Sequence, residues 1–196
     1  MLLELNRIMV PPGQKVLLKD VNWQEFETIV ADLGNHRSAR VAYDQGVLEI
    51  MAPLPEHEVN KVLIGNLIEA LLEELDIDFW CLGSTTFKNE LMQQGIEPDH
   101  CFYIQHEAAV RGKDRLDLAI DPPPDLAIEI DVTSRTHPQI YQNLGVPELW
   151  RFEQETLQIN QLQDGQYQPV ATSSLAPHLP LADMMPHCLR QSKLVG

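Results

Sequence analysis

The segment that most constrains the fold is residues 125–132, which read Asp-Leu-Ala-Ile-Glu-Ile-Asp-Val. Successive side chains of a strand point to opposite faces, so the apolar and the acidic residues separate. One face carries Leu126, Ile128, Ile130 and Val132, and the other carries Asp125, Ala127, Glu129 and Asp131. A strand apolar enough for the centre of a sheet holds carboxylates at a cost unless they are paired or bind metal. A solvated edge strand is the alternative interpretation.

The remaining pattern predicts helices and strands in one domain over residues 1–196, a length typical of a single domain. Helical spacing of apolar residues predicts helices over 23–33, 56–75 and 138–144. Asn22 is the expected N-cap of the first helix. Alternating or apolar segments predict a hairpin over 38–43 and 47–51, further strands within 77–90 and 101–104, and a strand pair over 148–152 and 156–162.

The long helix of residues 56–75 is expected to bury an apolar stripe. Its members are Val59, Leu63, Leu67, Ala70, Leu71 and Leu75. The domain core is expected to span about residues 20–165. Residues 170–196 are rich in proline and are predicted to form an irregular, peripheral tail.

Composition excludes several classes of protein. No apolar run reaches the roughly 20 residues that cross a bilayer, and no leader pattern begins the chain, so we expect a cytoplasmic protein with no membrane partner. Cys81, Cys101 and Cys188 form no C-x-x-C pair, which favours free thiols in a reducing compartment. The net charge is −15, from 14 basic and 29 acidic residues, and this argues against strong non-specific binding to nucleic acid.

A second acidic position lies thirty residues before Glu129. Asp99 ends the run Glu97-Pro98-Asp99, directly before the predicted strand 101–104. Two carboxylates from neighbouring strands suit Mg²⁺ or Mn²⁺, hard cations that keep several waters and accept phosphate oxygens. Such an ion lowers the pKa of a bound water. Asp99 and Glu129 are therefore the candidate metal ligands, with Asp131 as a further candidate.

The long helix begins with Glu56-His57-Glu58. Acidic residues in a first turn interact favourably with the helix dipole, which explains the run without any function. The functional alternative is that Glu58 or His57 faces the metal pocket and orients a water molecule. Both interpretations stay open at this point.

Five motifs follow one another in a characteristic order: YDQGVLEIM (43–51), PLPEHE (53–58), EPD (97–99), PDLAIEI (124–130), and Tyr141 followed by GVPELW (145–150). Over residues 20–165 this order resembles the putative restriction endonuclease family of bacterial proteins, a branch of the PD-(D/E)XK nuclease superfamily. The resemblance implies a restriction-endonuclease-like α/β (α+β) fold, with a central mixed sheet flanked by helices. It also implies a homodimer that depends on Mg²⁺.

The same resemblance assigns roles to individual residues. Asp99 takes the place of the motif's aspartate and Glu129 that of its (D/E). Glu58, or His57, matches the acidic helix position of many superfamily members. The lysine expected two residues after Glu129 is replaced by Asp131.

In related families the catalytic lysine lies instead four residues before the tyrosine, where this chain has His137. Lys61 and Lys88 are further candidates for the missing positive charge. We therefore expect a Mg²⁺-dependent (or Mn²⁺-dependent) endonuclease that hydrolyses phosphodiester bonds of nucleic acid, DNA rather than RNA. The alternative is a catalytically inactive nuclease fold that serves as a binding or interaction module.

Overall fold

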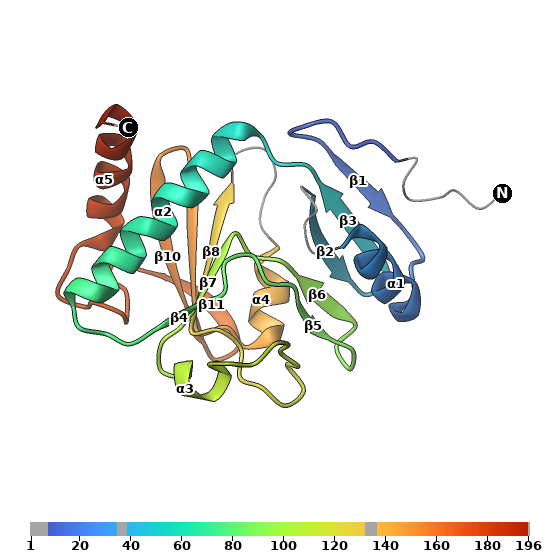
Figure 1. Ribbon diagram of the computed structural model, residues 1–196. Coiled ribbons are helices and arrows are strands. Elements are labelled where there is room, and N and C mark those ends of the chain that lie inside the picture. Colours follow the sequence, from blue (N-terminus) through green and yellow to red (C-terminus); the bar gives the residue numbers. More distant parts are fainter. Residues whose placement is uncertain (1–7, 35–38, 132–136, 196) are drawn as a thin grey trace.

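The computed structural model describes residues 8–34, 39–131 and 137–195. Two β-sheets lie side by side, and helices pack on their faces (Figure 1). The expected fold class, a mixed sheet with flanking helices, is confirmed. The predicted hairpin proves to be part of a separate five-stranded sheet, which the sequence did not predict.

The N-terminal sheet has five strands in the order β1-β3-β2-β6-β5, and every neighbouring pair is antiparallel. Its strands are β1 (Lys15–Leu18), β2 (Arg40–Asp44), β3 (Val47–Met51), β5 (Phe87–Asn89) and β6 (Gln94–Ile96). β2 and β3 form the predicted hairpin, although Ser38 lies outside the described residues. Helix α1 (Trp23–Leu33) covers one face of this sheet, and Asn22 caps it as expected.

The second sheet has six strands in the order β11-β10-β9-β8-β7-β4. Its strands are β4 (Trp80–Cys81), β7 (His100–Tyr103), β8 (Leu126–Asp131), β9 (Glu148–Glu153), β10 (Thr156–Gln163) and β11 (Gln166–Val170). β8 pairs antiparallel with β7 and parallel with β9, so the sheet is mixed and β8 is central. The edge-strand alternative for residues 125–132 is therefore wrong, and Val132 lies outside the described residues.

Helices α2 (Pro55–Glu74) and α5 (Leu181–Val195) pack together on one face of the second sheet (Figure 1). Leu181, Met185 and Leu189 of α5 are buried in the same core as β8, β9 and β10. The prediction of an irregular tail over 170–196 is wrong in this part. Pro186 lies inside α5 and concealed the helical spacing from the sequence pattern.

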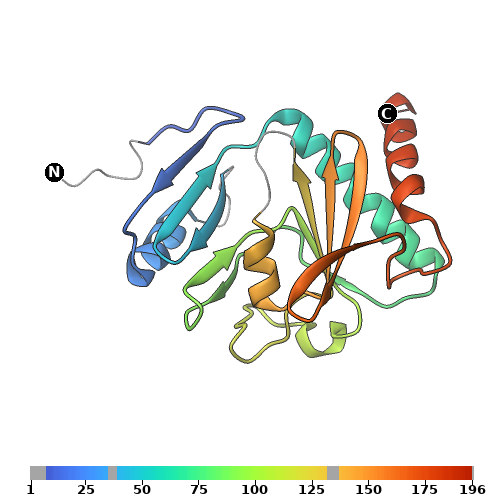
Figure 2. The ribbon, with the colours of Figure 1, turned by 180° about the vertical axis from the view of Figure 1, so that it is seen from behind.

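Helix α4 (Pro138–Leu144) and the short α3 (Glu107–Val110) cover the opposite face (Figure 2). Ile140, Tyr141 and Leu144 of α4 pack there against Ala127 and Leu149. Because Ala127 and Glu129 share one face of β8, this packing places α4 beside the acidic face of the strand.

The buried face of α2 differs from the predicted apolar stripe. Val59 is 52% exposed, and the fully buried apolar residues are Ile64, Ile68 and Leu72. The leucines of α2 lie on several sides of the helix, so periodicity alone does not identify the face that packs on the sheet. The same face continues to the N-terminus of α2 through Asn60 and His57. His57 is therefore buried, although the predicted stripe would have placed another face of the helix inward.

Candidate active site

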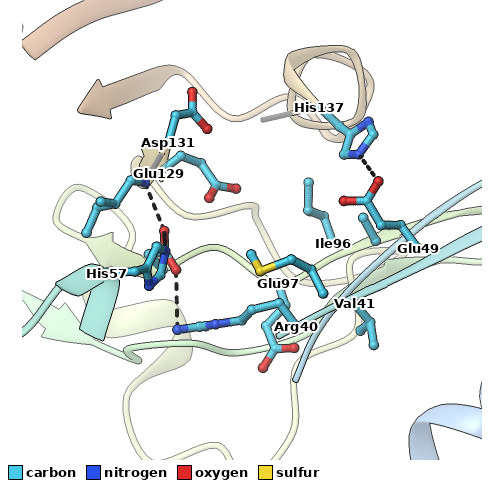
Figure 3. Close-up of a pocket in the computed structure, with 13 residues that line it drawn as sticks. Arg40, Val41, Glu49, His57, Ile96, Glu97, Glu129, Asp131 and His137 are labelled. Atoms are coloured by element: carbon cyan, nitrogen blue, oxygen red, sulfur yellow. Dashed lines mark hydrogen bonds and ion pairs between the residues drawn. The ribbon is translucent and has the colours of Figure 1, made fainter. Parts of the chain in front are cut away.

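A small pocket lies where the two sheets meet, with a cavity volume of about 50 Å³. It is drawn in Figure 3, and its charged or ionisable lining residues are Arg40, Glu49, His57, Glu97, Asp99, Glu129, Asp131 and His137. Five of the six predicted site residues belong to this set. The sixth, Glu58, does not line the pocket: its side chain is 48% exposed and contacts His57 and Arg40.

Asp99 is joined to β8 by its backbone and by its side chain. Its N–H donates to Ile128 O (3.1 Å), and Ile130 N–H donates to Asp99 Oδ2 (2.9 Å). These two bonds bracket Glu129 along the strand. Asp99 lies directly before β7 begins, and its carboxylate there accepts a hydrogen bond from the β8 backbone, which holds it beside Glu129.

Two basic side chains contact the Asp99 carboxylate. His57 Nε2 lies 3.0 Å from Oδ2, and Arg40 Nη2 lies 3.3 Å from Oδ1. Burial alone would raise the pKa of Asp99, but the hydrogen bond and charge of His57, with the charge of Arg40, hold it below its ordinary value. Asp99 is thus an anion in the site.

His57 lies between two carboxylates. Its Nε2 faces Asp99, and its Nδ1 lies 3.3 Å from Glu58 Oε1. Burial disfavours the charged ring, but Asp99 outweighs burial and the pKa of His57 is raised. At the start of α2, His57 is therefore buried in the pocket, and Glu58 lies outside it with a partly exposed side chain.

Glu129 projects into the pocket from the acidic face of β8, and the Tyr141 hydroxyl of α4 donates to its Oε1. Burial, and then the negative charge of Asp99, raise the pKa of Glu129 well above its ordinary value. A bound cation would reverse that balance.

The donor set fits a hard divalent ion. Within the described residues, no group of three or more His, Cys, Asp or Glu side chains is placed to hold a metal. Asp99 and Glu129 offer two carboxylates beside a cavity large enough for a few water molecules. Mg²⁺ commonly binds through one or two carboxylates and keeps its remaining waters, so this pair suits Mg²⁺ or Mn²⁺.

Asp131 lines the same pocket but carries an ion pair. Arg151 of β9 donates from Nε to Asp131 Oδ2 (3.0 Å), and its Nη2 lies 2.5 Å from the same oxygen. The parallel register sets Arg151 directly beside Glu129 on the neighbouring strand. Asp131, which stands at the expected lysine position, is therefore neutralised by Arg151 of β9.

None of the candidate replacements for the lysine contacts the Asp99–Glu129 pair. His137 Nε2 lies 3.3 Å from Glu49 Oε2. Lys61 donates to Ser84 Oγ (2.6 Å), and Lys88 pairs with Glu27 (2.8 Å). Neither lysine lines the pocket.

Arg40, Glu49 and Glu97 are the ionisable pocket residues for which the sequence predicted no role, and the first two come from the hairpin. The hairpin register pairs Arg40 with Met51 and Ala42 with Glu49, and all four residues line the pocket. The alternation within 38–43 and 47–51 was the available signal, because it places Arg40 and Glu49 on one face of the hairpin. Nothing in the local pattern indicated that this face turns towards Asp99.

The family model of putative restriction endonucleases (Uma2) matches residues 23–190 of the chain. A crystal structure of a putative nuclease belonging to DUF820 from Anabaena variabilis ATCC 29413 is similar, with a TM-score of 0.55 and 15% sequence identity. The similarity covers 76% of this chain and 90% of that one. A search of curated proteins finds no match. No helix among the described residues is long and apolar enough to cross a membrane.

Proposed function

The chain belongs to the Uma2 family of putative restriction endonucleases, and from that premise we propose that it is a Mg²⁺-dependent endonuclease that hydrolyses phosphodiester bonds of DNA. The observation that carries the proposal is the pair Asp99 and Glu129, two carboxylates that line one pocket, with Asp99 bonded to the β8 backbone on both sides of Glu129. We further propose that the protein acts in the cytoplasm as a homodimer. Two copies of the pocket could then each cleave one strand of a duplex.

Asp99 and Glu129 would hold the ion. Bound there, Mg²⁺ would supply an activated water and stabilise charge on the phosphate oxygens. His57 and the Ile130 N–H keep Asp99 in place, and the Tyr141 hydroxyl orients Glu129. These contacts come from α2, β8 and α4, so rigid elements determine the direction of both carboxylates.

Arg40 supplies a positive charge that lysine provides elsewhere in the superfamily. Its side chain is only 12% exposed, contacts Asp99, and bonds Pro98 O at 3.2 Å. A fixed guanidinium in a partly dry pocket stabilises negative charge that develops on a phosphate. This role makes the missing lysine at position 131 compatible with catalysis.

The binding of nucleic acid is expected to be weak without the metal. Several basic side chains are engaged by acids in the structure, including Lys15, Lys88, Arg111, Lys113 and Arg151. With 14 basic residues against 29 acidic ones, the chain should neutralise few phosphates, so its affinity for nucleic acid should depend only shallowly on salt concentration. Productive binding would then depend on the ion and on Arg40.

Cleavage assays test the proposal. Supercoiled plasmid, single-stranded DNA and RNA are incubated with the protein and Mg²⁺ or Mn²⁺, with EDTA as the blank. We expect cleavage of DNA that EDTA abolishes and that Glu129→Gln and Asp99→Asn reduce by at least about 100-fold. Glu153→Gln, a carboxylate that does not line the pocket, is the matched control.

Two observations support the inactive alternative. Asp131 replaces the motif lysine and is neutralised by Arg151, and the net charge is −15. Wild-type protein that binds Mn²⁺ but cleaves none of the three substrates would favour a binding module. Cleavage that survives in Glu129→Gln would instead contradict the assigned site.

A further inference from the structure

We infer that Glu49 is a positioning residue of this site, a carboxylate on the wall opposite Glu129 that orients water in the cavity and is itself held by Lys15 and His137. The inference rests on the proposed function, because the water concerned is that beside the Asp99–Glu129 pair. Neither the predicted motifs nor the family match assigns a role to Glu49.

The position of Glu49 follows from the N-terminal sheet. It lies in the middle of β3, paired with Leu17 of β1 on one side and Ala42 of β2 on the other. The residue is 7% exposed, so its carboxylate does not point into open solvent. A buried carboxylate in an interior strand needs partners, and Lys15 and His137 supply them.

Only one oxygen of this carboxylate is bonded within the described residues. Lys15 Nζ (2.9 Å) and His137 Nε2 (3.3 Å) both approach Oε2. Figure 3 shows the other oxygen of Glu49 pointing into the cavity, on the side that faces Glu129. An anchored carboxylate with one acceptor directed into a wet cavity is suited to orient a water molecule.

The two partners also keep Glu49 ionised. Burial raises its pKa, but the hydrogen bonds and charges of His137 and Lys15 outweigh burial and lower it. The other charged or ionisable groups that line the cavity are Arg40, His57, Glu97, Asp99, Glu129 and Asp131. A carboxylate with a lowered pKa is a weak base, so its role is to accept a hydrogen bond and not to remove a proton.

This arrangement changes the role of His137. Its Nε2 is bonded to Glu49, so the ring nitrogen nearest the pocket is directed to a carboxylate and not to a phosphate. Lysine at this position would help to orient the attacking water directly. Here His137 acts through Glu49, and the orienting group is a carboxylate from the hairpin.

Titration calorimetry with Mn²⁺ alone tests the inference without a nuclease substrate. Outer contacts to metal-bound water commonly change metal affinity by 10–100-fold. We expect Glu49→Gln to weaken Mn²⁺ binding at pH 7 by about 10-fold. Glu27→Gln is the matched control, since it removes one carboxylate from the comparable Lys88–Glu27 pair outside the pocket and should leave the affinity unchanged.

Two further variants address Glu49 without removing it. His137→Gln and Lys15→Met each remove a partner and raise the pKa of Glu49, so their Mn²⁺ affinity should fall more between pH 7 and pH 5 than that of wild type. These variants also serve if Glu49→Gln does not fold. In DNA cleavage, Glu49→Gln should lower kcat with little change in KM.

The outcomes are distinct. If wild type binds Mn²⁺ and Glu49→Gln binds it equally tightly, Glu49 has no such role and the proposed function stands. Equal pH dependence in wild type, His137→Gln and Lys15→Met would also overturn the inference. If wild type binds no Mn²⁺, the proposed function fails, and the role of Glu49 fails with it.

Discussion

Replacing Arg40 by methionine should destabilise the protein strongly, because it removes one partner of a buried ion pair. Arg40 Nη2 lies 3.3 Å from Asp99 Oδ1, and the two side chains are 12% and 4% exposed. At an effective dielectric constant of about 20, two charges at this distance attract by about 5 kcal/mol. Removal of one partner of such a pair usually costs about 3–5 kcal/mol, since the other charge stays buried.

We expect the lower end of that range for Arg40→Met. Asp99 keeps two other partners, His57 and the Ile130 N–H, so about 3 kcal/mol is the predicted loss. For a chain of this size the loss corresponds to a Tm lowered by about 6–12 °C. Thermal unfolding followed by circular dichroism in EDTA measures it.

Lys88→Met is the matched control. The Lys88–Glu27 pair is shorter, at 2.8 Å, but its side chains are 33% and 35% exposed. Solvent screening limits such a pair to below about 1 kcal/mol. If the two variants lower Tm by the same small amount, burial does not determine the strength of the Arg40–Asp99 pair and the reasoning is wrong.

Three other changes have defined outcomes. The folded-state pKa of Glu129 is raised well above 4.5, so its contribution to stability is present at low pH and is lost as the pH rises above that value. Glu129→Gln should therefore gain stability relative to wild type as the pH rises, as measured by urea unfolding in EDTA. Glu148→Ala leaves the buried donors Trp150 Nε1 and Ser173 Oγ without their acceptor and should lower the free energy of unfolding by about 3 kcal/mol, with Mn²⁺ affinity unchanged. Gly65→Ala places a Cβ 2.5 Å from His100 Nε2, and this overpacking should lower the free energy of unfolding by about 1–3 kcal/mol despite the better helix propensity of alanine, as a thermal melt would show.

Local patterns in the sequence predicted the elements that carry the site. Alternation in residues 125–132 placed Glu129 and Asp131 on one face of β8, and that strand is central as expected. Capping by Asn22 and the helical spacing after it located α1 at its observed bounds. These features depend on residues a few positions apart, so they can be recognised without the fold.

Other features could not be predicted because one local sequence pattern is compatible with several structures. Leucines on many sides of α2 left its buried face undetermined, and packing on β8 selected the face that includes His57. Pro186 concealed α5, which is held by contacts with α2 and β10. In both cases burial of apolar surface against a distant element outweighs local propensity.

The amino-acid sequence by itself determined the two carboxylates, Asp99 and Glu129, and the strand geometry that presents them. Only the tertiary structure decided which charges accompany them. The contacts Arg40–Asp99, His137–Glu49 and Arg151–Asp131 join residues 20 to 88 positions apart. Such pairs form only when the strands of the mixed sheet align and the N-terminal sheet packs beside it, because ion-pair strength depends on distance and burial, and neither is set by local sequence.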